Sequence, residues 1–172
     1  MKKIILLGYM GCGKSTIAKL LAENVSLPYL DLDEIIEKRE NAAVKNIFSE
    51  KGEIYFRKLE HDIFSDLMKN QDDFILSLGG GTPCYANNHE LLKGENVFSI
   101  YLNASIPTLY NRLINEKENR PLIADKSEGE LKEYIAKNLF DRSYYYNQAQ
   151  FKVVIDGNSA KEITNEIELL LA

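Results

Sequence analysis

Residues 8–16 read GYMGCGKST, which matches the pattern G-x-x-x-x-G-K-[ST]. The apolar residues 4–7 precede it and residues 17–22 follow with helical spacing, so the motif has the strand-loop-helix setting that it requires. Glycines let the backbone curl, so that successive N–H groups and the start of the helix can hold phosphate oxygens. Lys14 is expected to reach the β- and γ-phosphates of a nucleotide, and Ser15 to offer its hydroxyl to Mg²⁺. The candidate phosphate-binding residues are Gly11, Cys12, Gly13, Lys14, Ser15 and Thr16.

Length and composition limit the classes of protein to consider. A chain of 172 residues with 45% hydrophobic content suits one domain with a real core. The net charge is −5 and the basic residues are scattered, which argues against nucleic acid as a partner. No apolar stretch approaches the roughly 18 residues of a membrane-spanning helix, and a core strand begins too early to leave room for a signal peptide. We therefore expect a cytoplasmic protein without a membrane partner.

Apolar runs alternate with segments of helical periodicity along the chain. This alternation predicts an α/β fold in which helices cover both faces of a parallel five-stranded sheet. Two cysteines, Cys12 and Cys84, lie in or near glycine loops, so neither is expected to form a disulfide or to bind a metal. The expected strands lie at residues 3–7, 27–31, 73–78, 96–102 and 151–155.

Two acids, Asp31 and Asp33, follow the short apolar strand at residues 27–31. Acids at the carboxyl end of a strand beside the phosphate-binding loop face the crevice where open α/β sheets bind ligands. One carboxylate could then hold Mg²⁺, directly or through water, while the other accepts a proton from an acceptor hydroxyl. The alternative is that Asp33 only caps the helix that follows. Spacing alone leaves both interpretations open.

A second glycine feature is the triplet Gly79, Gly80 and Gly81, which follows the buried strand at residues 73–78. Three consecutive glycines allow a ligand to approach the backbone closely, although a plain tight turn is the competing explanation. This strand carries Ser77 where many phosphate-loop proteins have a magnesium-binding Asp, so Asp31 is the nearest candidate acid. Arg57 lies on a helical segment, where most arginines are solvated, and its pattern alone does not mark it as functional.

Together these motifs resemble the shikimate kinase family along the whole chain. The family's loop is present at residues 8–15, its D-x-D at residues 31–33 and its glycine triplet at residues 79–81. Its G-E-x-x-F-R-x-x-E signature reads GEIYFRKLE at residues 52–60, and its R-P-L reads the same at residues 120–122. The set in this order is much more specific than any one motif.

The resemblance implies a nucleoside-monophosphate-kinase-like fold of the P-loop NTPase class and transfer of the γ-phosphoryl group of ATP to the 3-hydroxyl of shikimate. It implies that Asp33 binds the acceptor and takes its proton, and that Arg57 pairs with the substrate carboxylate. It also implies that Gly80 contacts shikimate and that Arg120 closes over ATP from a lid. The expected organisation is one domain, residues 1–172, with a substrate-binding insertion at about 33–61 and a lid at about 112–126.

The family's last substrate arginine corresponds to Arg142, in the run DRSYYYNQA at residues 141–149. The proline common after that arginine is missing, and aligning Tyr145 and Ala149 with the family's Tyr and Ala leaves the spacing from the arginine to the tyrosine one residue short. Without the resemblance, this run would predict a helix that packs its tyrosines and exposes Arg142. Two other functions stay open, namely a kinase of the same fold for gluconate or a nucleotide, and a nucleotide-binding regulatory module without catalysis. We expect a monomer whose small-molecule partners are ATP and shikimate, with Mg²⁺ as cofactor.

Overall fold

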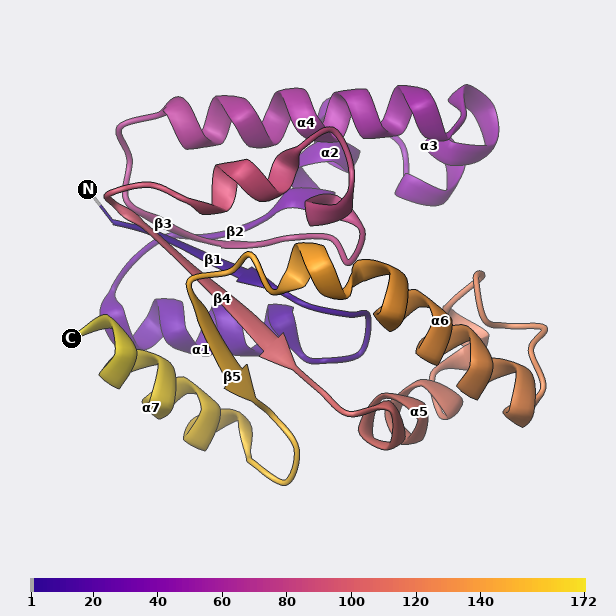
Figure 1. Ribbon diagram of the computed structural model, residues 1–172. Coiled ribbons are helices and arrows are strands. Elements are labelled where there is room, and N and C mark those ends of the chain that lie inside the picture. The colour runs from indigo at the N-terminus through magenta and orange to yellow at the C-terminus, as the bar shows by residue number, and fades with distance from the viewer. Residues whose placement is uncertain (1) are drawn as a thin grey trace.

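A parallel five-stranded sheet forms the centre of the computed structural model, which describes residues 2–172 (Figure 1). The strand order is β2-β3-β1-β4-β5, and all four neighbouring pairs run parallel. This confirms the sheet expected from the apolar runs. The strands are β1 (Lys3–Leu7), β2 (Tyr29–Asp31), β3 (Phe74–Ser77), β4 (Val97–Asn103) and β5 (Phe151–Val154).

Helices cover both faces of the sheet. Figure 1 shows α1 and α7 below the sheet and α2 and α4 above it, while α5 and α6 lie beyond the carboxyl ends of the strands. The α-helices are α1 (Lys14–Val25), α2 (Leu32–Glu40), α3 (Val44–Lys51), α4 (Glu53–Lys69), α5 (Ile106–Ile114), α6 (Glu128–Tyr146) and α7 (Ala160–Leu171). Three short 3-10 helices are η1 (Thr82–Cys84), η2 (Asn88–Leu92) and η3 (Lys117–Asn119).

Burial on both faces explains why the central strands are almost continuously apolar. Every residue of β1 and β3 is buried, as expected for strands with a helix layer on each side. Helix α1 turns Ile17, Ala18 and Leu21 toward the sheet and leaves Lys19 exposed. Each fully buried Ile or Leu stabilises the fold by about 1.5–3 kcal/mol through removal of apolar surface from water.

The topology determines where a ligand can bind. From β1 the chain passes to β2 and β3 on one side of the sheet, and later to β4 and β5 on the other side. The carboxyl end of β1 is therefore the point at which the winding reverses, and ligands of open α/β sheets bind in the crevice outside that point. The loop at residues 8–13 leaves β1 there, and the glycine triplet leaves the neighbouring β3.

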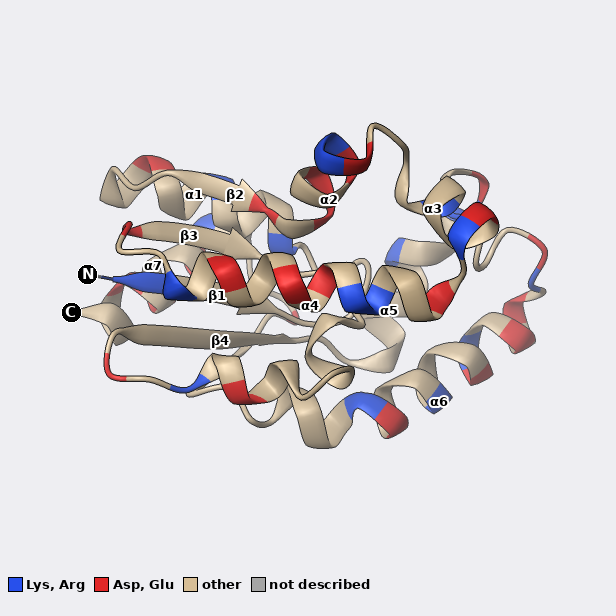
Figure 2. Cartoon of the chain, turned by 90° about the horizontal axis from the view of Figure 1, so that it is seen from above, with Lys and Arg blue, Asp and Glu red and all other residues tan. Residues whose placement is uncertain are grey.

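Charged residues of both signs are interspersed along α4 and α6 (Figure 2). The two cysteines, Cys12 and Cys84, are free thiols, and Cys12 is buried. Within residues 2–172, no helix is long and apolar enough to cross a membrane.

Candidate active site

The loop after β1 closes around the Lys14 ammonium group. Gly13 precedes α1 with φ of 96°, a left-handed conformation that strains other residues but is accessible to glycine. Lys14 Nζ donates to the carbonyl oxygens of Gly8 at 2.8 Å and Tyr9 at 3.1 Å. The ammonium group is thus held within the loop, beside the N-terminus of α1, where backbone N–H groups and the helix dipole favour an anion.

Asp31 ends β2 and pairs in register with Ser77 at the end of β3. Its carboxylate accepts hydrogen bonds from the Glu34 backbone N–H at 3.1 Å and from Ser15 Oγ at 3.3 Å. Asp31 is therefore the N-cap of α2, because the strand ends at this residue and the helix begins at Leu32. The interpretation of Asp33 as the helix cap is wrong. The structure also brings Asp31 beside Ser77, at the position where an acid was missing from β3.

Asp33 lies in the first turn of α2 and lines a cleft of about 440 Å³ together with Lys14. Burial raises the pKa of Asp33 to about 6, and the nearby carboxylates of Asp31 and Glu60 act in the same direction, while Lys14 partly opposes them. A carboxyl group with this pKa is mostly ionised at neutral pH but still accepts a proton readily. Asp33 thus has the properties of a general base in the cleft.

The glycine triplet is the point at which three functional side chains meet. A Cβ atom added to Gly79 would lie 3.1 Å from Asp33 Oδ1, and one added to Gly80 would lie 3.3 Å from Arg142 Nη1. A Cβ atom on Gly81 would lie only 2.8 Å from Arg57 Nη2, so any other residue at this position would displace the end of the Arg57 side chain. One carboxylate and two guanidinium groups therefore converge on consecutive residues next to the phosphate-binding loop.

Arg57 projects from α4 toward this triplet and is largely buried, with 17% of its side chain exposed. Its Nη1 donates to Glu60 Oε1 at 2.9 Å, and Glu60 is itself buried and accepts from Thr82 Oγ1 at 2.8 Å. The expectation from helical pattern alone, that such an arginine is solvated, is wrong for Arg57. Glu60 binds one edge of the guanidinium group, because about one turn of α4 separates the two residues and a buried charge needs a partner.

Arg142 reaches the triplet from α6. Its guanidinium carbon lies 5.6 Å from the ring centroid of Tyr9, and the hydroxyl of the buried Tyr146 donates to the Gly80 carbonyl at 2.6 Å. The periodicity of residues 141–149 predicts an exposed Arg142, and this is wrong because the side chain is half-buried against the triplet. Arg142, which corresponds to the family's last arginine, therefore lies beside Gly80.

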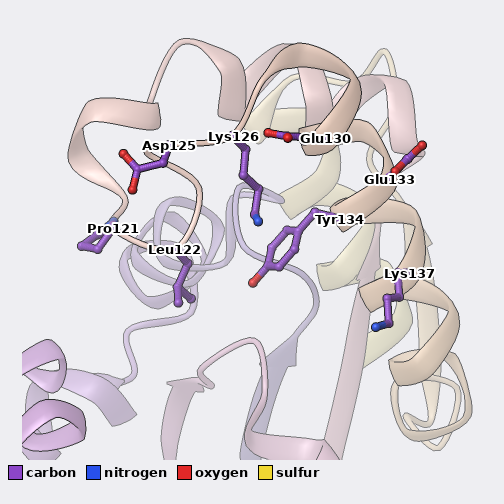
Figure 3. A pocket seen from close by; sticks show the side chains of 8 residues that line it. All are labelled: Pro121, Leu122, Asp125, Lys126, Glu130, Glu133, Tyr134 and Lys137. Carbon is purple, nitrogen blue, oxygen red and sulfur yellow. The ribbon is translucent and has the colours of Figure 1, made fainter.

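Arg120 lies in the segment between α5 and α6, and it also lines the cleft. Its Nη2 and Nε contact Glu116 Oε2 at 2.7 Å and 2.8 Å. Beyond it, Ile123 is buried whereas Leu122 is 68% exposed. Figure 3 shows a hollow between this segment and α6, in which Lys126 points toward the ring of Tyr134; its Nζ lies 4.5 Å from the ring centroid. Ile123 is the one buried residue among residues 115–126.

Comparison with known proteins identifies the family. The family model described as shikimate kinase matches residues 10–171. The chain belongs to the shikimate kinase family. A shikimate kinase of Flavobacterium johnsoniae is 58% identical over 172 residues, which is the full length of both chains. The crystal structure of shikimate kinase from Bacteroides thetaiotaomicron has a TM-score of 0.90 at 33% identity, with 99% of this chain and 98% of that chain covered. Shikimate kinase from Acinetobacter baumannii in complex with shikimate has a TM-score of 0.87 at 28% identity, with 99% and 93% covered.

Most residues predicted from the sequence lie together in this shikimate kinase. Lys14, Ser15 and Asp33 share the cleft with Arg120, and Cys12 is buried behind the loop with its Sγ 3.9 Å from Lys14 Nζ. The other predicted residues that line the cleft are Gly11, Gly13, Thr16, Asp31, Gly79 and Gly80. Arg57, Gly81 and Arg142 do not line this cleft but lie beside it at the glycine triplet, on the side that we call the acceptor side.

Three side chains that support the shikimate kinase site were not predicted as site residues. Glu60 holds Arg57, Tyr146 holds the Gly80 carbonyl, and Glu116 pairs with Arg120. The signal for Glu60 was present in the sequence, because it lies three residues from Arg57 on α4, the spacing of neighbours on one helix face. Glu116 had no such signal, because it and Arg120 lie in the segment between α5 and α6 and not on one α-helix. Tyr146 had no such signal, since its partner lies in a distant loop.

Proposed function

We propose that this chain transfers the γ-phosphoryl group of ATP to the 3-hydroxyl of shikimate, giving shikimate 3-phosphate and ADP. The observation that carries the proposal is the convergence of Asp33, Arg142 and Arg57 on the glycine triplet beside the phosphate-binding loop. This set of charges suits an acceptor that has both a carboxylate and hydroxyl groups. A neutral polyol would leave both guanidinium groups without an anion to bind.

Asp33 and Arg57 have separate roles in the proposed mechanism. Arg57 binds the shikimate carboxylate with its planar guanidinium, which matches carboxylate geometry. Asp33 holds the reacting hydroxyl and accepts its proton as the bond to phosphorus forms. Arg142 contributes a second positive charge on the acceptor side, and Gly79, Gly80 and Gly81 let the substrate approach the backbone.

The phosphoryl-transfer side depends on Lys14 and Arg120. Lys14 exchanges its loop carbonyl partners for the β- and γ-phosphates of ATP, and the backbone N–H groups of residues 11–16 hold the remaining oxygens. Arg120 leaves Glu116 when the segment at about 112–126 closes as a lid, and it then balances charge on the transferred group. Closure also excludes water from the reaction.

Ser15 and Asp31 are the residues that would hold Mg²⁺. A hydroxyl and a carboxylate are hard oxygen donors of the kind that this ion prefers, and Ser15 Oγ lies 3.3 Å from Asp31 Oδ2 at the edge of the cleft. Residues 2–172 contain no cluster of three or more His, Cys, Asp or Glu that could enclose a metal, so water and phosphate oxygens would complete the shell. When bound, the ion neutralises phosphate charge.

We further propose a single cytoplasmic domain, residues 1–172, with a substrate-binding insertion at about 33–61, that acts as a monomer in aromatic amino-acid synthesis. A coupled assay of ADP release tests the function with shikimate, quinate, gluconate and nucleoside monophosphates as acceptors. Shikimate is expected to give the highest kcat/KM by a wide margin. Equal turnover of gluconate or of a nucleoside monophosphate would support another kinase of this fold, and no turnover with any acceptor would support a regulatory module.

Arg57→Ala is expected to raise the KM for shikimate by about 10- to 100-fold, because a charge-assisted hydrogen bond contributes roughly 1.5–3 kcal/mol. Affinity for ATP without shikimate should stay nearly unchanged, since Arg57 lies on the acceptor side. Steady-state kinetics and equilibrium ATP binding measure the two effects. Arg39→Ala, on α2 and outside the active-site cleft, is the matched control. An equal loss of ATP affinity in Arg57→Ala would indicate that the residue only maintains the fold.

Asp31→Asn is expected to increase the magnesium concentration that gives half-maximal turnover, and excess magnesium should restore much of the rate. The substitution isolates the charge, because Asn caps a helix about as well as Asp and so preserves the start of α2. Magnesium titration of turnover provides the measurement. The same titration on Asp33→Asn should show no rescue, and the opposite pattern would reverse the roles assigned to the two acids.

A further inference from the structure

Tyr85 follows η1 and covers one face of the Arg57 guanidinium group. The guanidinium carbon lies 3.9 Å from the centroid of the Tyr85 ring, which is the shortest distance between a cationic group and an aromatic ring among residues 2–172. Phe56 and Phe48 lie farther from the same carbon, at 5.3 Å and 5.7 Å. Three aromatic rings therefore surround the group that is expected to bind the substrate carboxylate, and Tyr85 is the nearest.

The polar contacts of Arg57 leave its orientation incompletely fixed. Nη1 is hydrogen-bonded to Glu60, but Nε is buried and has no hydrogen-bond partner within residues 2–172. Glu53 Oε1 lies 3.5 Å from Nε and offers a competing anion toward solvent, since 54% of its side chain is exposed. A single hydrogen bond allows the guanidinium plane to rotate about it, whereas a ring stacked on the plane opposes that rotation.

We propose that Tyr85 is a positioning residue for the acceptor, acting through Arg57. The face of its ring stacks on the guanidinium group, opposes rotation of the group about the Glu60 hydrogen bond and leaves Nη2, which faces Gly81, available to the substrate carboxylate. An arginine held by stacking keeps its N–H groups free, because the ring face contacts the plane and not the donors. This inference rests on the proposed function, since it requires an anionic acceptor.

The position of Tyr85 fits this role better than a role in the core. Tyr85 is 38% exposed, so its removal loses less buried surface than removal of the fully buried Phe64 or Phe74. Hydrogen bonds of Thr82, the first residue of η1, hold the loop that carries Tyr85. The Thr82 carbonyl accepts from Asn88 Nδ2 at 2.9 Å, and Thr82 Oγ1 donates to Glu60. The loop that carries Tyr85 is thus tied to the same carboxylate that holds Arg57, so ring and guanidinium share one support.

Replacement of Tyr85 by Leu and by Phe tests the proposal. Tyr85→Leu should raise the KM for shikimate about tenfold, the size expected for a desolvated cation–π contact, with kcat within about twofold of wild type. Tyr85→Phe keeps the aromatic ring, so its KM for shikimate should equal that of the wild type. Phe98→Leu is the matched control, because it removes a ring that lies 5.1 Å from Lys2 Nζ at the opposite end of the sheet. It should leave the KM for shikimate unchanged.

Two further measurements separate positioning from a general structural effect. In the Arg57→Ala background, Tyr85→Leu should cause no additional rise in KM, because the ring then has no guanidinium group to orient. Phenylalanine with increasing fluorine substitution at position 85 should raise KM stepwise as the ring face loses negative charge, and this series keeps the shape if Tyr85→Leu fails to fold. A wild-type KM in Tyr85→Leu or across the fluorinated series, or the full effect in the Arg57→Ala background, would overturn the proposal.

The outcome is distinguishable from failure of the proposed function. If the wild-type enzyme does not phosphorylate shikimate, the function itself is wrong. If the wild type is active and the Tyr85 variants behave as wild type, only the role of Tyr85 is wrong.

Discussion

Replacement of Lys14 by Met is expected to lower kcat by a factor on the order of 10³, because a charged group that faces the transferred phosphate in a closed site contributes several kcal/mol to the transition state. In the ligand-free protein its Nζ is held by the carbonyls of Gly8 and Tyr9, so the ammonium group is already placed where the phosphates arrive. Met preserves the length and the apolar stem but removes the charge. The assay is single-turnover phosphoryl transfer at saturating ATP and shikimate, with ATP binding measured separately.

Lys19→Met is the matched control for this substitution. Lys19 lies on the same helix, is exposed and does not line the cleft; its Nζ is 5.4 Å from the ring centroid of Tyr29. Its replacement should leave kcat within about twofold of wild type, in line with the small effect usual for surface substitutions. If Lys14→Met kept a rate within tenfold of wild type, the phosphate site would have to lie elsewhere.

Asp33→Asn is expected to lower kcat by about 10²–10⁴-fold, since the amide keeps the shape of the side chain but cannot accept the proton. In the wild type, kcat/KM should rise with pH, with a midpoint near pH 6, and level off above about pH 7, because burial raises the pKa of Asp33 to about 6. Glu34→Gln, an exposed neighbour on α2, is the control and should leave the pH profile unchanged. A flat wild-type profile between pH 5 and pH 8, together with an active Asp33→Asn, would contradict the role of general base.

The same pKa predicts that Asp33 lowers the stability of the folded protein at neutral pH. An Asp in the unfolded chain has a pKa of about 4, so between about pH 4 and pH 6 the unfolded state ionises first and the folded state loses stability as the pH rises. Asn carries no charge, so its burial does not involve the free energy of ionising a buried carboxyl group. Asp33→Asn should therefore be more stable than wild type above pH 6 by about 2 kcal/mol, and equally stable below pH 4. Urea unfolding at several pH values measures the difference.

Local sequence signals were sufficient for the parts of the fold that depend on periodicity and on motif. The buried strands read as apolar runs because a parallel sheet is covered on both faces, and the loop at residues 8–16 has a fixed spacing that only a phosphate-binding turn requires. The glycine triplet was recognisable as a place of close approach. The groups that approach it were not apparent from local pattern, because Arg57 and Arg142 come from helices far along the chain.

The incorrect expectations about the helix cap and about the exposure of two arginines have two physical causes. Asp31 and Asp33 are separated by one residue, and the end of β2 decides which of them caps α2; boundaries of elements are uncertain by a residue or two from sequence. The exposure of Arg57 and Arg142 was misjudged because helical periodicity describes one helix, whereas their burial arises from contacts with the loop after β3. Tertiary contacts therefore determine the burial of Arg57 and Arg142. Their candidate roles came from the resemblance to the family, because helical periodicity did not indicate them.

The central claim is that the acceptor side recognises the carboxylate of shikimate through Arg57. The most direct test measures kcat/KM for shikimate and for an analogue with a hydroxymethyl group in place of the carboxylate, in the wild type and in Arg57→Ala. The wild type should prefer shikimate by about 10- to 100-fold, in line with roughly 1.5–3 kcal/mol for a hydrogen bond to a charged group, and Arg57→Ala should lose most of that preference. An undiminished preference in Arg57→Ala would contradict the account.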